Sequence, residues 1–153
     1  MLETYSRVLV RAGYCVSQAA SGLHAIAALE AGTFDAILSD ITMPGLNGLD
    51  MLRAVREHDL DVPVIMNTGD PSVETAAKAM EFGALRYLVK PVERAELMNA
   101  VHDAVRLGRL ARLKREAATY LGMADGQPAD RAGLVGHPSA SLTPAGVRTI
   151  VVI

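Results

Sequence analysis

The stretch that decides the fold is residues 34–48, FDAILSDITMPGLNG, where an apolar run ends in Asp40 and a loop rich in Gly and Pro follows. The apolar run predicts a short strand that is buried on both faces of a sheet. The loop turns the chain away and leaves the Asp40 carboxylate at the rim of the sheet, where ligands bind in open α/β sheets. A carboxylate at that place can bind a metal, act as a nucleophile, or only cap the next turn.

On both sides of this stretch, short aliphatic strands alternate with helices of ten or more residues. We expect strands at 14–19, 35–39, 62–66 and 85–89, and helices ending near Gly13, Ala31, His58, Gly83 and Tyr120. Ser21 and Ser72 stand where N-caps are expected. The alternation predicts βαβ units, and therefore an α/β fold with a parallel sheet and helices on both of its faces.

Composition limits the classes of function. The chain has 153 residues, of which 50% are hydrophobic and only 4% aromatic, so we expect one domain plus an appendage around an aliphatic core. A net charge of -2 argues against a nucleic-acid partner. No apolar run is long enough to span a membrane and no signal peptide is visible, so we expect a cytoplasmic protein without a membrane partner. Cys15 is the only cysteine and is expected to be a small core residue.

Polar side chains end three of the predicted strands. They are Asp40, the pair Asn67-Thr68, and Lys90 before Pro91. The ends of parallel strands lie at one edge, so a carboxylate, a hydroxyl and an ammonium group converge there. Each residue alone has an ordinary explanation, as a turn residue or a solvated lysine. Together they suit a phosphoryl group on Asp40, with Thr68 donating a hydrogen bond and Lys90 offsetting the added negative charge.

With these residues, the chain resembles the response-regulator receiver domain of two-component signalling over about residues 2–118. The motifs are Asp40-Ile41-Thr42-Met43-Pro44 with Gly48, then Pro63-Val64-Ile65 leading to Thr68-Gly69, and Gly83-Ala84 before Tyr87-Leu88-Val89-Lys90-Pro91. The resemblance implies a flavodoxin-like, doubly wound parallel sheet with strand order 2-1-3-4-5.

The resemblance also implies roles. Asp40 is the expected phosphoacceptor, supplied by a histidine kinase or a phosphotransfer protein, in a signalling module that is not an enzyme. Thr68 and Tyr87 are the expected switch residues, and Lys90 the expected phosphate contact. Met43, Pro44, Gly48 and Pro91 shape the neighbouring loops, and the peptide bond before Pro91 is often cis in the family.

Receivers hold Mg²⁺ with acidic residues that end their first strand, but this sequence starts within what resembles the first helix. Asp40 and the backbone carbonyl of Thr42 alone form a weak metal site, because Mg²⁺ prefers near-octahedral oxygen ligands. We therefore expect Mg²⁺ binding to be doubtful and phosphorylation to be impaired. A truncated or frame-shifted reading frame would explain both ends of the sequence.

The absent first strand would leave a gap in the middle of the sheet. The C-terminal run 147–153 is strongly β-prone, and residues 119–146 have the composition of a flexible linker. A parallel strand that enters the gap would keep a right-handed crossover. Otherwise the run is a loose, aggregation-prone end. We thus divide the chain into a receiver-like domain at 1–118, a linker at 119–146 and a β-prone segment at 147–153.

The long last helix carries Arg106, Arg109, Arg112 and Arg115 at successive i+3 positions. We expect a solvated basic face on a helix that extends past the domain; a signalling helix or a homodimer seam is the alternative. This segment and residues 69–76 look like receivers that are fused to cyclic-di-GMP phosphodiesterase (EAL) domains, and that output domain is absent here.

Three functional hypotheses follow. The first is a receiver-like phosphorelay module, and the second is a pseudo-receiver that acts as a phosphorylation-independent docking or dimerisation module. The third is a small hydrolase with an aspartate nucleophile, which the shortage of further acids disfavours.

Overall fold

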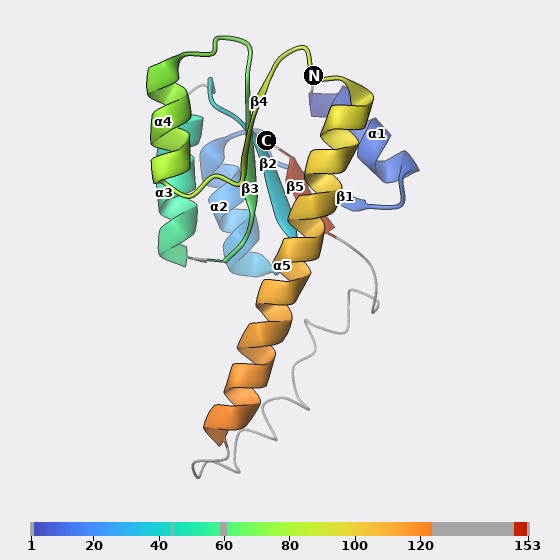
Figure 1. The fold of residues 1–153 in the computed structure, drawn as a ribbon, viewed down its shortest axis with the longest axis vertical. Coiled ribbons are helices and arrows are strands. Elements are labelled where there is room, and N and C mark those ends of the chain that lie inside the picture. The colour runs from blue at the N-terminus through green and yellow to red at the C-terminus, as the bar shows by residue number, and fades with distance from the viewer. Residues whose placement is uncertain (1, 44, 59–60, 124–148, 153) are drawn as a thin grey trace.

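The computed structural model describes residues 2–43, 45–58, 61–123 and 149–152. Five parallel strands form one sheet in the order β1-β5-β2-β3-β4 (Figure 1). The strands are β1 (Cys15–Gln18), β2 (Ala36–Asp40), β3 (Val64–Thr68), β4 (Arg86–Val89) and β5 (Thr149–Val152). The predicted α/β fold with a parallel sheet is confirmed.

Helices cover both faces of the sheet. On one face lie α1 (Leu2–Arg11) and α5 (Arg94–Met123); on the other lie α2 (Gly22–Ala31), α3 (Gly48–His58) and α4 (Val73–Glu81) (Figure 1). None of the described helices is both long enough and apolar enough to cross a membrane. Two layers of helices around a buried sheet are the doubly wound arrangement that the strand–helix alternation predicts.

The C-terminal strand β5 lies in the middle of the sheet. Ile150 is in register with Val16 of β1 on one side and with Ala36 of β2 on the other. The other four strands keep the order expected from the family, so β5 lies where the family has its first strand. The predicted closure of the gap by the C-terminal run is confirmed for residues 149–152.

Aliphatic side chains fill the space on both sides of the sheet. Along β2, Ala36 and Leu38 pack in the cluster under α1 and α5, whereas Ile37 packs in the cluster under α2, α3 and α4. All three are fully buried. This alternation is the side-chain period of a strand, and it explains why the run 36–38 is apolar at every position.

Local signals place several of the helix ends. The side chains of Ser21 and Ser72 accept hydrogen bonds from the backbone N–H groups of His24 and Thr75, at 3.3 and 3.0 Å. These are the expected N-caps of α2 and α4. Gly83, which follows α4, adopts a φ of +89°, a conformation that favours glycine.

The structure corrects the expected burial of Cys15 and the expected end of α5. Cys15 is exposed, because β1 lies at the edge of the sheet. Helix α5 continues to Met123, past the expected start of the linker at 119, since good helix formers such as Ala117 and Leu121 precede Gly122. The expected flexible character of 124–146 falls outside the described residues.

The expected basic face of α5 is not uniformly solvated. Arg112 forms an ion pair of 3.1 Å with Asp35, whose side chain is only 2% exposed. Arg115 approaches Asp61 to 3.5 Å. These two arginines bind the middle of α5 to the segments that lead into β2 and β3, which the i+3 spacing alone could not reveal.

Candidate functional site at the carboxyl ends of the strands

Asp40 is the last residue of β2, and backbone hydrogen bonds hold the residues that follow it. Ile41 N–H donates to the carbonyl of Asn67 at 3.0 Å, and Gly48 N–H donates to the carbonyl of Ile41 at 2.8 Å. A Cβ atom on Gly48 would lie 2.2 Å from the carbonyl oxygen of Asp40. Only glycine fits there, so the start of α3 closes directly against the backbone of the candidate phosphoacceptor.

Lys90 reaches the Asp40 carboxylate from two strands away. Its Nζ lies 2.5 Å from Asp40 Oδ2, and both side chains are mostly buried, with 15% and 24% exposure. The lysine follows β4, so its stem must cross the end of β3, where a Cβ on Gly69 would lie 3.8 Å from Lys90 Cδ. Thr42 N–H donates to the other carboxylate oxygen of Asp40 at 3.1 Å. The carboxylate is thus held by an ammonium group and a backbone amide.

Thr68 lies at the end of β3, between the strands that carry Asp40 and Lys90. It is buried, its carbonyl accepts from Lys90 N–H at 2.8 Å, and its Oγ1 accepts from Asp70 N–H at 3.1 Å. The structure therefore brings Thr68 to the same edge of the sheet as Asp40 and Lys90. Its hydroxyl oxygen is held by the loop that follows β3.

Tyr87 of β4 directs its hydroxyl toward α4. Its Oη shares a 2.8 Å hydrogen bond with Thr75 Oγ1 and accepts a weaker one from Ser72 N–H at 3.4 Å. The ring packs against the cluster under α2, α3 and α4. The hydroxyl of Tyr87 and the Asp40–Lys90 pair therefore have separate partners.

The remaining predicted loop residues are placed as follows. Met43 packs against the cluster on the side of α3, and Pro91 is exposed after a cis peptide bond with Lys90. Pro44 falls outside the described residues.

Sequence reasoning placed Asn67 beside Thr68 at the end of a strand but gave it no role in the site. Asn67 is in register with Asp40, so the two side chains leave the sheet on the same face. It is 2% exposed, and its Oδ1 atom has no hydrogen-bond partner in the part of the chain that the structure describes. A polar residue inside the apolar run of β3, one position before Thr68, was the available signal.

Tyr5 of α1 is the second residue that the sequence did not single out. Burial raises the pKa of its hydroxyl, the Lys90 ammonium lowers that pKa and the Asp40 carboxylate raises it, with burial the largest of the three effects. Tyr5 thus lies within electrostatic reach of the Asp40–Lys90 pair. Helical spacing predicts an inward-facing residue here, but not that it faces the site.

The donors around Asp40 do not fit a complete Mg²⁺ site. Among the described residues, no group of three or more His, Cys, Asp or Glu side chains could hold a metal ion. Within the described residues, the contacts with Lys90 and with the Thr42 amide involve a single carboxylate, that of Asp40. The Lys90 ammonium already neutralises its charge.

The comparisons with known proteins agree with this geometry. The profile of the response regulator receiver domain family matches residues 1–102. The chain belongs to that family.

The chain is 34% identical over 122 residues to the transcriptional regulatory protein ZraR of Klebsiella oxytoca, covering 78% of this chain and 28% of ZraR. It is 35% identical over 106 residues to the transcriptional regulatory protein CusR of Escherichia coli, covering 69% of this chain and 47% of CusR. The chain thus spans less than half the length of these relatives.

Solved structures share the fold. A CheY-like receiver domain protein of Methanospirillum hungatei superposes with a TM-score of 0.68 at 26% identity, covering 72% of this chain and 88% of that one. The chemotaxis protein CheY4 of Vibrio cholerae gives a TM-score of 0.64 at 32% identity, covering 67% and 88%. The CheY-like receiver fold is therefore established for this chain.

Proposed function

We propose that this chain is a receiver module of phosphorelay signal transduction in the cytoplasm, with Asp40 as the phosphoacceptor. The observation that carries the proposal is the 2.5 Å pair between the Asp40 carboxylate and the Lys90 ammonium at the strand ends. A carboxylate oxygen attacks the phosphorus of a phosphohistidine on a histidine kinase or a phosphotransfer protein. The P–N bond breaks as the P–O bond forms, and its electron pair stays on the ring nitrogen, so a ring that is protonated on its other nitrogen leaves as neutral imidazole.

Lys90 and Thr68 act on the product of that transfer. A phosphoryl group on Asp40 adds negative charge beside Lys90, and the ammonium offsets it as a compact cation. The Thr68 hydroxyl can donate a hydrogen bond to a phosphoryl oxygen, because in its present contact with the Asp70 N–H group the Thr68 Oγ1 atom acts as the acceptor. Tyr87 follows in this proposal by giving up its bond to Thr75 when Thr68 moves.

Phosphorylation of Asp40 is impaired in this chain. A single carboxylate that is already paired with Lys90 binds a divalent cation weakly. Mg²⁺ sites in proteins usually include one or two free carboxylates. The same observation favours the second candidate, a pseudo-receiver that docks or dimerises without phosphorylation. Its signal would come from binding alone.

In this proposal, the last helix connects the module to its output. Helix α5 runs well past the sheet (Figure 1), as a signalling helix or a homodimer seam would. The resemblance of residues 69–76 and 106–115 to receivers with EAL domains supports a role in cyclic-di-GMP signalling. The division into 1–118, 119–146 and 147–153 then separates the receiver, its tether and the strand that completes the sheet, with the last helix of the receiver extended to Met123.

Acetyl phosphate tests the function directly. We expect slow addition of one phosphoryl group to the intact chain, measured by mass spectrometry, and no addition to Asp40→Asn. Asp50→Asn is the matched control, because Asp50 lies in the first turn of α3 and is exposed. Modification that persists in Asp40→Asn contradicts the assignment of the phosphoacceptor.

The same reaction with and without Mg²⁺ separates the two candidates. A receiver with an intact acidic pair, run alongside, defines the ordinary rate. Stimulation by Mg²⁺ to that rate contradicts the impairment. Absence of any modification of Asp40 favours the pseudo-receiver.

A further inference from the structure

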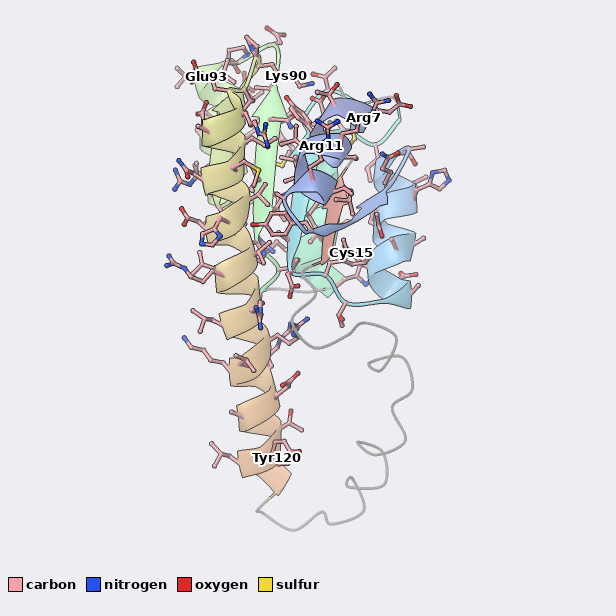
Figure 2. The ribbon with its side chains drawn as sticks, turned by 90° about the vertical axis from the view of Figure 1, so that its right-hand side faces the viewer. Arg7, Arg11, Cys15, Lys90, Glu93 and Tyr120 are labelled. Atoms are coloured by element: carbon pink, nitrogen blue, oxygen red, sulfur yellow. The ribbon has the colours of Figure 1, made fainter. Side chains whose placement is uncertain are left out.

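Three arginines from two helices line a cavity outside the phosphoacceptor site. The cavity has a volume of about 220 Å³ and is lined by Thr4, Arg7, Val8 and Arg11 of α1 and by Arg94 of α5. Figure 2 shows Arg7 and Arg11 on α1, beside the first turns of α5. The cavity lies on the outer side of α1, whereas Tyr5 of the same helix faces the buried side near Asp40 and Lys90.

No carboxylate neutralises these arginines within the described residues. The ion pairs of the described chain join other residues, and Arg7, Arg11 and Arg94 form none of them. Glu3 on α1 and Glu93 before α5 are the nearest acids along the sequence, and both remain outside ion-pair distance. This contrasts with Arg86, Arg106, Arg112 and Arg115, each of which has an acidic partner.

The arrangement is electrostatically unfavourable without a counter-charge. Arg7 and Arg11 are four residues apart on one helix, where like charges destabilise the helix. Arg94 adds a third positive charge across the cavity. A chain with a net charge of -2 therefore concentrates unpaired positive charge at one concave place.

The chemistry of the lining selects the class of ligand. A guanidinium group presents its N–H donors in a planar fork that matches phosphate oxygens in pairs. Thr4 adds a hydroxyl donor, and the Val8 side chain gives an apolar wall. A concave site of this size accommodates one or two phosphate groups, whereas an acidic protein surface would contact arginines on a flat or convex face.

We propose that this Arg7–Arg11–Arg94 cavity binds a phosphate-bearing small molecule, such as a diphosphate or a phosphate monoester. The site is separate from Asp40, and its occupation does not require phosphorylation of that residue. Because α1 carries both this cavity and Tyr5, a bound anion stabilises the helix that covers the phosphoacceptor site.

Inorganic pyrophosphate is the probe, titrated into the full chain with a chelator present and followed by calorimetry and by amide NMR shifts. We expect saturable binding at millimolar concentration or tighter, with the largest shifts in α1 and the first turn of α5. Arg7→Gln, Arg11→Gln and Arg94→Gln should each weaken binding about tenfold, since each removes a charge-assisted contact. Added salt should weaken it further.

Arg106→Gln is the matched control, because it removes the same charge from α5 about 18 Å further along the helix. It should leave the affinity within about twofold of the starting value. Amide spectra of each variant establish that the fold is retained. The affinity for pyrophosphate, and not stability, is the readout.

Four outcomes overturn the proposal. They are no binding of pyrophosphate, equal weakening by Arg106→Gln, affinity unchanged in all three cavity variants, and loss of binding in Lys90→Gln alone, which would assign the anion to the Asp40 site. A short polyglutamate peptide is the second probe. If the peptide binds through the three arginines and pyrophosphate does not, the cavity recognises an acidic protein and the small-molecule assignment is wrong.

Discussion

The two halves of the sheet are built in different ways. Strands β2, β3 and β4 follow one another along the chain, joined by α3 and α4, and they carry Asp40, Thr68 and Lys90. The other half joins β1 from the beginning of the chain to β5 from its end. In this second half the sequence neighbours are not spatial neighbours, so its assembly requires closure of a long loop.

One half of the sheet provides the chemistry of the site, and the other half completes the fold. Among the described residues, the contacts that hold the Asp40 carboxylate come from the first half, from Lys90 and from the Thr42 amide. Within the described residues, strand β5 pairs with β2 over Ala36–Leu38. We infer that β5 supports the site by bracing β2, while β3 and β4 determine its chemistry.

The largest expected effect comes from breaking the central strand. Ile150→Pro removes a backbone donor and adds a steric clash in a strand that has neighbours on both sides, which costs about 3 kcal/mol or more. Urea unfolding followed by circular dichroism should show a fold that is lost or strongly destabilised. Ile150→Val, the matched control, should stay within about 1.5 kcal/mol of the original stability. A stable Ile150→Pro variant would mean that β5 contributes little to the fold.

The next effect tests how α5 lies against the first half of the sheet. A Cβ atom on Gly108 would lie 1.9 Å from the carbonyl oxygen of Asp35, so Gly108→Ala should destabilise the fold by about 3 kcal/mol. On the same helix, Gly122 has nothing within 4 Å of such an atom. Gly122→Ala should stabilise α5 by up to about 1 kcal/mol. Equal effects of the two changes in thermal unfolding would contradict the observed packing of α5.

A smaller effect compares the two ion pairs of α5. Arg112→Met removes a partner of the buried Asp35 and should cost about 2 kcal/mol, because a buried carboxylate loses much of its compensation. Arg115→Met affects an exposed pair and should cost less than about 1 kcal/mol. Chemical denaturation of both variants measures the difference. If Arg115→Met costs as much as Arg112→Met, burial does not decide the strength of these pairs.

The smallest effect is a pH dependence from Tyr5. Its pKa is raised in the folded state, so the unfolded chain loses the hydroxyl proton first as the pH rises. The stability that Tyr5 contributes is full below its unfolded pKa of about 10 and falls as the pH rises toward the folded pKa. As the pH rises from neutral to the folded pKa of Tyr5, the Tyr5→Phe variant should therefore lose less stability than the original chain. Parallel pH curves for the two proteins would contradict the burial of this hydroxyl.

The sequence allowed the fold to be predicted better than the site. Aliphatic runs at strand spacing, Ser21 and Ser72 before helices, and the β-prone C-terminus each have a local physical cause, and the structure agrees with them. The approach of Tyr5 to the site and the partner of Arg112 depend on which segments meet in space, which no local pattern contains. The exposure of Cys15 has the same origin, because an apolar strand does not show by itself that it lies at an edge.

The most direct test of the central claim uses the only cysteine of the chain. Cys15 is in register with Thr149 on neighbouring parallel strands, whose spacing of about 4.8 Å allows a disulfide. Under mild oxidation, Thr149→Cys should form a bond to Cys15 within one monomer, identified by peptide mapping and non-reducing electrophoresis. Thiols that both stay free, or cross-links found only between chains, would contradict the completion of the sheet by β5 of the same chain.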